Sequence, residues 1–98
     1  MKKLIKAFIW PAGIIEKCFA KHDVVPNEAE AAFSNSPKFK RWENGDVEGE
    51  DFYQCLGKTD EGRFLTIFFI FKKTGEALII SARDMDPKEK RRYGKKKD

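Results

Sequence analysis

The sequence predicts an α+β domain, in which helices are segregated from an antiparallel sheet. Three observations lead to this prediction. Apolar residues recur at helical spacing in the first third of the chain, strand-like segments separated by glycine turns fill the second half, and a helix-capping signal stands near the end. Neither a βαβ repeat nor a glycine-rich phosphate loop is present in the sequence. At 98 residues the chain has the size of one domain. We expect residues 1–93 to form it and residues 94–98 to be a basic tail.

The first third of the chain predicts a short strand and two helices. Residues 5–10 alternate in the manner of a strand, and Pro11 then opens a helix because its fixed φ suits the first turn. This helix ends near Lys21. Pro26 starts a second helix with acidic residues in its first turn, where the helix dipole favours them, and residues 34–37 close it. The residues predicted to face the core are Ile14, Ile15, Cys18 and Phe19 of the first helix and Ala29, Ala32 and Phe33 of the second.

The second half of the chain predicts an antiparallel meander of three to four strands. Residues 63–71 are the most apolar, which is typical of a central strand. Turn signals separate the segments: Asn44-Gly45 with an acidic hairpin loop through Asp51, residues 57–62, and Thr74-Gly75. The predicted strands cover residues 38–44, 52–56, 63–71 and 76–83.

The last predicted element is a helix over residues 87–93. The run Asp86-Pro87-Lys88-Glu89 places an N-cap residue, a proline at the first helical position and a glutamate at the third, in that order. This arrangement is the sequence signal of a capping box.

The positive charge of the chain is concentrated in its last sixteen residues. The formal net charge is +4, and residues 1–82 carry twelve basic and twelve acidic side chains, whereas residues 83–98 carry eight and four. A local basic block indicates a phosphate or another anionic partner. The alternative is a tail that aids solubility.

Composition argues against a membrane, an exported or a metal-binding protein. The longest apolar run, residues 64–71, is too short to span a bilayer. Lys6 and Pro11 interrupt the apolar stretch near the start, and no Ala-x-Ala site follows it, so we expect no signal peptide. Cys18 and Cys55 are too few for a disulfide scaffold and suggest buried thiols in a reducing cytoplasm. With one histidine beside them, no zinc site is expected.

The single histidine is the first candidate for chemistry. His22 follows Lys21 at the predicted end of the first helix. Histidine has an ordinary pKa near neutrality and can transfer protons in catalysis. A histidine or lysine in the last turn of a helix also commonly complements the helix dipole. The sequence leaves both interpretations open.

Arg83 is the second candidate, because it stands where a buried strand leaves the core. A guanidinium held by a rigid element can bind a phosphate through two parallel hydrogen bonds. The alternative is an ion pair with Asp84, Asp86 or the acidic hairpin loop.

The final helix is the third candidate. Glu89 and Tyr93 are one turn apart, and a ridge of cations adjoins them: Lys88, Arg91, Arg92 and Lys95. With His22, these groups could form an acid–base site for RNA cleavage, in which a ribose 2′-hydroxyl attacks the neighbouring phosphate without a metal ion. The structural alternative is that Tyr93 packs the helix on the sheet and Glu89 only caps it.

In these residues the chain resembles the BrnT family of toxins from type II toxin–antitoxin systems, over about residues 8–93. The most specific element is residues 79–83, Ile-Ile-Ser-Ala-Arg, followed by Glu89 and Tyr93. The other matching pieces are Trp10, Lys21-His22, Glu28-Ala29 with Phe33, Leu56-Gly57, Thr59-Asp60 and residues 62–65.

The resemblance implies a small ribonuclease toxin with a RelE-like fold. It also implies a DNA-binding, BrnA-like antitoxin, through which the pair reaches its operator DNA. By position, the family-pattern residues are Lys21, His22, Arg63, Arg83, Glu89 and Tyr93. We expect Arg83 and Arg63 to bind phosphate, His22 and Glu89 to transfer protons, and Tyr93 to stack on a base or orient the phosphate. The residues expected to dock RNA are Lys21, Arg63, Lys88, Arg91, Arg92 and Lys95.

The chain departs from the family pattern at three positions. Phe52 stands where the family commonly has an arginine, Asp23 where it has a glycine, and Val25 where it has a capping serine. The loss of an arginine would remove a phosphate contact, for which Arg41 or the terminal cations could compensate. The alternative function is therefore a non-catalytic module of the same fold that binds nucleic acid or an acidic protein. A third hypothesis is that the domain has a purely structural role.

Overall fold

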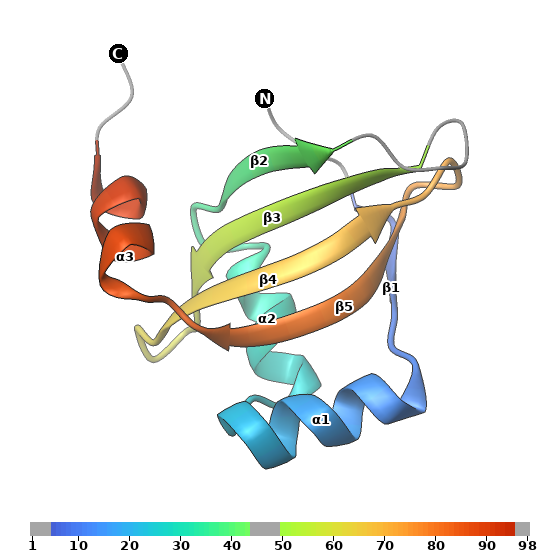
Figure 1. Cartoon of the computed structure of the whole chain (residues 1–98), viewed down its shortest axis with the longest axis horizontal. Helices are drawn as coiled ribbons and strands as arrows, with labels where there is room; N and C mark the ends of the chain where they lie inside the picture. Colours follow the sequence, from blue (N-terminus) through green and yellow to red (C-terminus); the bar gives the residue numbers. More distant parts are fainter. Residues whose placement is uncertain (1–4, 44–49, 96–98) are drawn as a thin grey trace.

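The computed structural model describes residues 5–43 and 50–95 and confirms the α+β class. A five-stranded sheet is built in the order β1-β5-β4-β3-β2, with helices placed around it (Figure 1). The elements are β1 (Ala7–Ile9), α1 (Ala12–His22), α2 (Pro26–Ala32), β2 (Lys38–Glu43), β3 (Asp51–Lys58), β4 (Phe64–Phe71), β5 (Glu76–Asp84) and α3 (Pro87–Gly94).

The predicted meander is confirmed as four consecutive antiparallel strands, β2 to β5, with β4 in the middle of the sheet. The N-terminal strand β1 completes the sheet by pairing in parallel with β5. Residues 44–49 and 96–98 lie outside the described residues, and with them most of the predicted acidic hairpin loop and tail.

The third strand is longer than its sequence signal, because Gly57 belongs to β3 and not to the following turn. Gly57 pairs with Leu65 of β4. A Cβ at this position would lie 2.2 Å from the backbone oxygen of Ala32, so only glycine lets α2 approach the sheet this closely. The turn itself uses Gly62, whose φ of +93° is a conformation that glycine adopts without strain.

Helices α1 and α2 cover one face of the sheet, which we call the inner face (Figure 1). Helix α1 packs on β5, and α2 packs on β3 and β4. The alternating period of each strand places small and apolar side chains between the layers. The buried core includes Cys18, Val24, Ala29 and Ala32 from the helical side and Cys55, Leu65, Ile67, Phe69, Ile79 and Ala82 from the strands.

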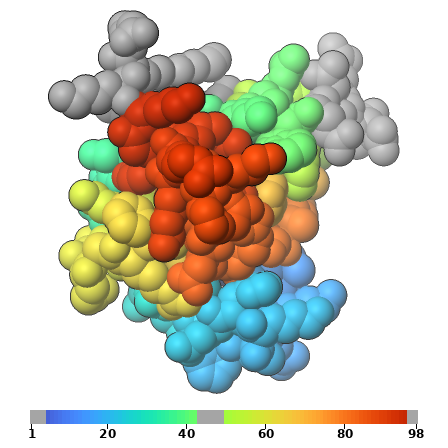
Figure 2. Space-filling view, turned by 60° about the vertical axis from the view of Figure 1, so that its left-hand side comes forward, coloured from blue at the N-terminus to red at the C-terminus, as the bar shows by residue number. Residues whose placement is uncertain are grey.

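The opposite face of the sheet, the outer face, carries α3 at one end only. The alternate side chains of β3, β4 and β5 point to it, among them Gln54, Thr66 and Arg83, which contact α3 through Glu89. The capping box predicted for this helix is confirmed: the Glu89 amide donates to Asp86 Oδ1 at 2.8 Å, and the Asp86 amide donates to Glu89 Oε1 at 2.9 Å. Figure 2 shows the outer surface of α3 exposed on this side of the molecule.

Candidate functional site

The predicted site residues gather in two groups at the same end of the sheet. One group surrounds Glu89 on the outer face and contains Arg83; we call it the Glu89 cluster. The other surrounds Arg63, where β4 begins beside the end of α1, and contains His22; we call it the Arg63 cluster. Asp84, which Arg63 binds, follows Arg83 in β5 and pairs with Leu65 near the start of β4, so the two clusters adjoin at this end of the sheet.

The capping box determines where the Glu89 carboxylate lies. Because Glu89 is the third residue of α3, its side chain folds back toward the helix start and over the sheet. It is buried, with only 7% of its surface exposed. Arg83 meets it with both terminal nitrogens: Nη1 donates to Oε1 and Nη2 to Oε2, each at 2.9 Å. This pairing differs from each of the ion pairs considered for Arg83 from the sequence.

Three further donors satisfy the same carboxylate. Gln54 Nε2 donates to Oε2 at 3.0 Å, Thr66 Oγ1 donates to Oε1 at 2.8 Å, and the Asp86 amide donates to Oε1. Burial disfavours the charged form of Glu89, but the hydrogen bonds from Arg83, the Asp86 amide and Thr66 outweigh it and lower the pKa of this carboxyl to about 2. A carboxylate with so low a pKa and five donors is a poor proton acceptor at neutral pH.

Arg83 retains hydrogen-bonding capacity after it has bound Glu89. A guanidinium has five N–H donors. Its Nη1 donates to Glu89 and to the Asp84 carbonyl oxygen at 3.0 Å, and Nη2 gives one hydrogen to Glu89. The Nε–H and the second Nη2–H donate to none of the described residues. These two donors form one edge of the guanidinium plane, and the side chain is 30% exposed.

The Glu89 cluster extends along the outer face through Gln54. The Gln54 Oε1 atom accepts hydrogen bonds from Trp42 Nε1 at 3.1 Å and from Arg92 Nη2. Sequence reasoning had not assigned Gln54 or Thr66 to the site. A signal was present, because each is a polar residue inside an otherwise apolar strand and alternates onto the face that carries Arg83.

Arg63, in contrast, has no free donor. Its Nε and Nη2 donate to the two carboxylate oxygens of Asp84 at 2.7 and 3.1 Å. The second Nη2–H donates to the His22 carbonyl at 2.8 Å, and Nη1 donates to the Asp23 carbonyl at 2.7 Å and to the Glu28 carboxylate. All five N–H groups are therefore engaged within the protein.

The contacts of Arg63 attach the end of α1 to the sheet. Asp23 ends α1 in the left-handed conformation with φ of 54°, and its amide donates to the Phe19 carbonyl at 3.0 Å. His22 is half-buried and Lys21 is exposed. The pKa of Asp84 is lowered mainly by its hydrogen bond from Arg63 and to a smaller degree by the nearby His22. Arg63 thus connects the His22 backbone carbonyl to Asp84, the last residue of β5, which directly follows Arg83 in the sequence.

Tyr93 joins α3 to the segment that follows α2. Its hydroxyl donates to the Ser36 carbonyl at 3.0 Å and approaches the Asn35 carbonyl at 3.3 Å. Its ring meets Phe64 edge-on, with 5.9 Å between centroids. Burial, with a smaller contribution from Cys55, raises the pKa of Tyr93. These contacts are those of a side chain that docks a helix.

The predicted cationic ridge is divided between exposed and engaged side chains. Lys88 and Arg91 are exposed and form no ion pair or hydrogen bond with the described residues. Arg92 contacts Gln54, and Lys38 Nζ donates to the carbonyl oxygens of Arg92, at 3.2 Å, and Lys95. Among the described residues, no group of three or more His, Cys, Asp or Glu side chains could hold a metal ion. Within residues 5–43 and 50–95, no helix is long and apolar enough to cross a membrane.

A comparison with models of protein families identifies one family that the chain matches. The model of the family described as the ribonuclease toxin BrnT of type II toxin–antitoxin systems matches residues 10–89. The chain belongs to the BrnT family. Membership implies an RNA substrate and an antitoxin partner. The matched range contains His22, Arg63, Arg83 and Glu89 and ends before Tyr93. The comparison with curated proteins gave no match.

Proposed function

We propose that this BrnT-family protein is an endoribonuclease that cleaves RNA without a metal ion. A ribose 2′-oxygen attacks the adjacent phosphorus, the bond from phosphorus to the 5′-oxygen breaks, and the products end in a 2′,3′-cyclic phosphate and a 5′-hydroxyl. The observation that carries the proposal is the free Nε–Nη2 edge of Arg83 beside the cationic helix α3. This edge presents two parallel donors to a phosphate.

The proposed roles follow the hydrogen bonds of each side chain. Arg83 binds the non-bridging phosphate oxygens and stabilises the charge that grows on them in the transition state. Glu89 is a positioning residue, because its five donors hold it ionised and it fixes the Arg83 plane. His22 transfers the proton from the attacking 2′-hydroxyl or to the leaving 5′-oxygen. Arg63, whose donors are all engaged, supports the fold by attaching the end of α1 to the sheet.

The remaining predicted residues serve the RNA backbone or the fold. Exposed Lys21, Lys88 and Arg91 attract the sugar–phosphate chain, with Arg92 and Lys95 at the end of α3 beside them. Tyr93 keeps α3 in place over the sheet. The exposed cations also suit an acidic segment of the antitoxin. We propose that this antitoxin is BrnA-like and carries the pair to operator DNA, and that both act in the cytoplasm.

The experiment is cleavage of unstructured RNA oligomers by purified protein in the presence of a chelator. We expect products with 2′,3′-cyclic phosphate ends, no cleavage of 2′-O-methyl oligomers of the same sequence, and a rate about 100-fold to 1000-fold lower for Arg83→Ala. If the wild type and Arg83→Ala cannot be told apart, Arg83 does not have this role. Circular dichroism of both proteins controls for folding.

One observation favours a second candidate, a non-catalytic RNA-binding module. The Glu89 carboxylate and the Tyr93 hydroxyl are engaged in internal hydrogen bonds, which leaves His22 as the one proton-transfer group among the predicted catalytic residues. Salt-sensitive RNA binding without any cleavage in the same assay would support this function and reject the enzyme.

A further inference from the structure

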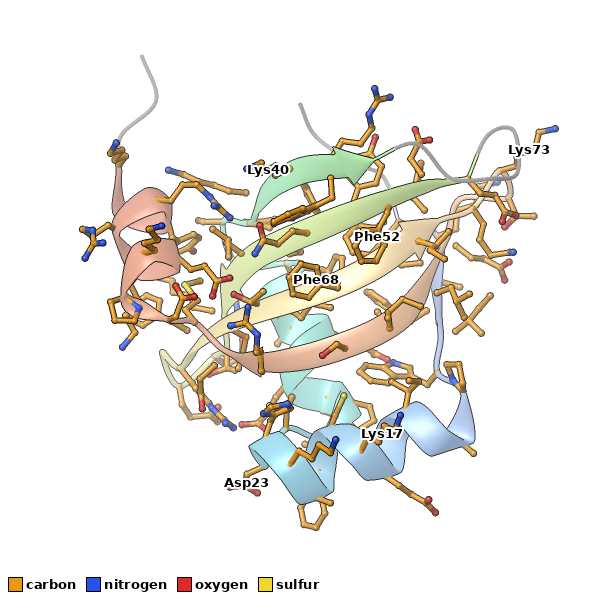
Figure 3. All side chains as sticks on the ribbon, in the orientation of Figure 1. Lys17, Asp23, Lys40, Phe52, Phe68 and Lys73 are labelled. Atoms are coloured by element: carbon orange, nitrogen blue, oxygen red, sulfur yellow. The ribbon has the colours of Figure 1, made fainter. Side chains whose placement is uncertain are left out.

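The outer face carries three aromatic rings that none of the described helices covers. Phe52 of β3 and Phe68 of β4 have ring planes within 10° of parallel and centroids 5.8 Å apart, and Trp42 of β2 meets Phe68 edge-on at 6.1 Å. Figure 3 shows Phe52 and Phe68 over their strands on the near side of the sheet, with Lys40 on β2 beyond them. We call these three rings the aromatic platform.

The platform is open to solvent although it is apolar. Trp42 is 51% exposed, and Phe52 and Phe68 are each half-buried. A larger aromatic cluster of the described residues, which includes Phe33 and Phe69, lies on the inner face under the helices, where such rings normally pack. An aromatic cluster on the uncovered face of a sheet indicates a binding surface.

Cations contact two of the three rings of the platform. The Arg83 guanidinium lies 5.7 Å from the centre of the Phe68 ring, and Lys40 Nζ lies 5.1 Å from the centre of the Trp42 ring. Arg92 is held beside Trp42, because both donate to the same oxygen of Gln54. The Glu89 carboxylate, which binds Arg83, is buried under its five donors. The face therefore offers aromatic surfaces next to positive charge.

We propose that the aromatic platform stacks unpaired bases of single-stranded RNA next to a phosphate held by Arg83. This inference rests on the proposed function, in which Arg83 binds the scissile phosphate. Aromatic side chains interleaved with cations are how proteins bind single strands, because every base has a face to stack while the cations follow the backbone. In a duplex the base faces are occupied by neighbouring bases, so the platform selects unpaired RNA. The same surface would suit an apolar protein segment less well, since cations stand at two of its rings.

The test measures binding separately from cleavage. A fluorescent 2′-O-methyl oligomer without secondary structure cannot be cleaved through its 2′-oxygen, and its affinity is measured for the wild type, Trp42→Leu, Phe52→Leu and the control Phe19→Leu. Phe19, which the sequence predicts to face the core, is instead 58% exposed on α1. We expect each platform variant to bind between about fivefold and about 150-fold more weakly. Phe19→Leu should bind like the wild type, and a duplex of the same sequence should bind more weakly than the single strand.

An oligomer with abasic sites separates stacking from charge. It keeps the phosphates, so we expect the wild type, Trp42→Leu and Phe52→Leu to bind it with equal affinity. Thermal unfolding of each variant shows that the comparison is made between folded proteins. The proposal is wrong if the wild type and both platform variants bind the normal single strand equally, or if the duplex binds more tightly. The outer face would then be a surface for a protein partner. Cleavage of ribose RNA that depends on Arg83 would in that case leave the proposed function standing.

Discussion

Arg63, which directly precedes β4, and Arg83 of β5 lie at the same end of one sheet, yet their guanidinium groups are used in different ways. Arg63 donates all five of its N–H groups to Asp84, Glu28 and two backbone carbonyls at the end of α1. Arg83 uses three, and its Nε–Nη2 edge donates to none of the described residues. The charge of an arginine therefore does not by itself make it a phosphate ligand. Its remaining hydrogen-bond donors decide whether it can bind.

The Glu89 cluster should be the more sensitive of the two to loss of one partner. Glu89→Gln replaces a buried carboxylate that accepts five hydrogen bonds and leaves Arg83 partly buried without its counter-charge. We expect the free energy of unfolding to fall by about 3 to 4 kcal/mol at neutral pH. Asp84→Asn in the Arg63 cluster should cost about 1 kcal/mol or less, because the Asp84 side chain is 61% exposed. Urea unfolding of both variants tests this, and equal losses would remove the distinction between the clusters.

Acid should destabilise the protein mainly through Glu89. Its pKa is lowered from 4.5 to about 2 in the folded state, so its contribution to stability is complete above pH 4.5 and is lost as the pH falls toward 2. We expect the wild type to lose about 2 to 3 kcal/mol of unfolding free energy across this range from Glu89. The profile of Asp84→Asn should keep most of this slope. If Asp84→Asn flattens the acid limb as much as Glu89→Gln does, the assignment of the slope to Glu89 is wrong.

The smallest effect is expected at the helix end in the Arg63 cluster. Arg63 binds the backbone carbonyl of Asp23 and not its side chain, and Asp23 has a positive φ that a glycine adopts more easily. Asp23→Gly should therefore raise the unfolding free energy by about 0.5 to 1 kcal/mol without changing RNA cleavage. A loss of stability or of activity in this variant would give the Asp23 carboxylate a function that its contacts do not indicate.

The elements of the fold could be predicted where local signals determine them. The capping box at residues 86–89 and the turn at Gly75 act within a few residues, and both were found as expected. Gly57 was misread as part of a turn, because the reason for a glycine there is the distant Ala32 of α2. The parallel pairing of β1 with β5 could not be predicted from local signals either, because the two strands are distant in the sequence.

The candidate site could be predicted in membership but not in roles. The sequence indicated Arg63, Arg83 and Glu89 as a group. Nothing in the sequence shows that the N–H donors of Arg63 are all engaged within the protein while two donors of Arg83 are not. That separation depends on carbonyl groups at the end of α1, which tertiary structure brings to Arg63. The role of Glu89 likewise depends on Gln54 and Thr66, which reach it from two different strands.

One paired measurement tests the central claim that Arg83 acts on the substrate while Arg63 only supports the fold. RNA cleavage and unfolding free energy are measured on the same preparations of Arg83→Lys and Arg63→Lys, which keep the charge but lose the planar group. We predict that Arg83→Lys lowers kcat/KM by about 100-fold or more. Arg63→Lys should lose about 1 to 2 kcal/mol of stability, with kcat/KM of the folded protein within about threefold of the wild type. Equal losses of activity in folded Arg63→Lys and Arg83→Lys would contradict this difference between the two arginines.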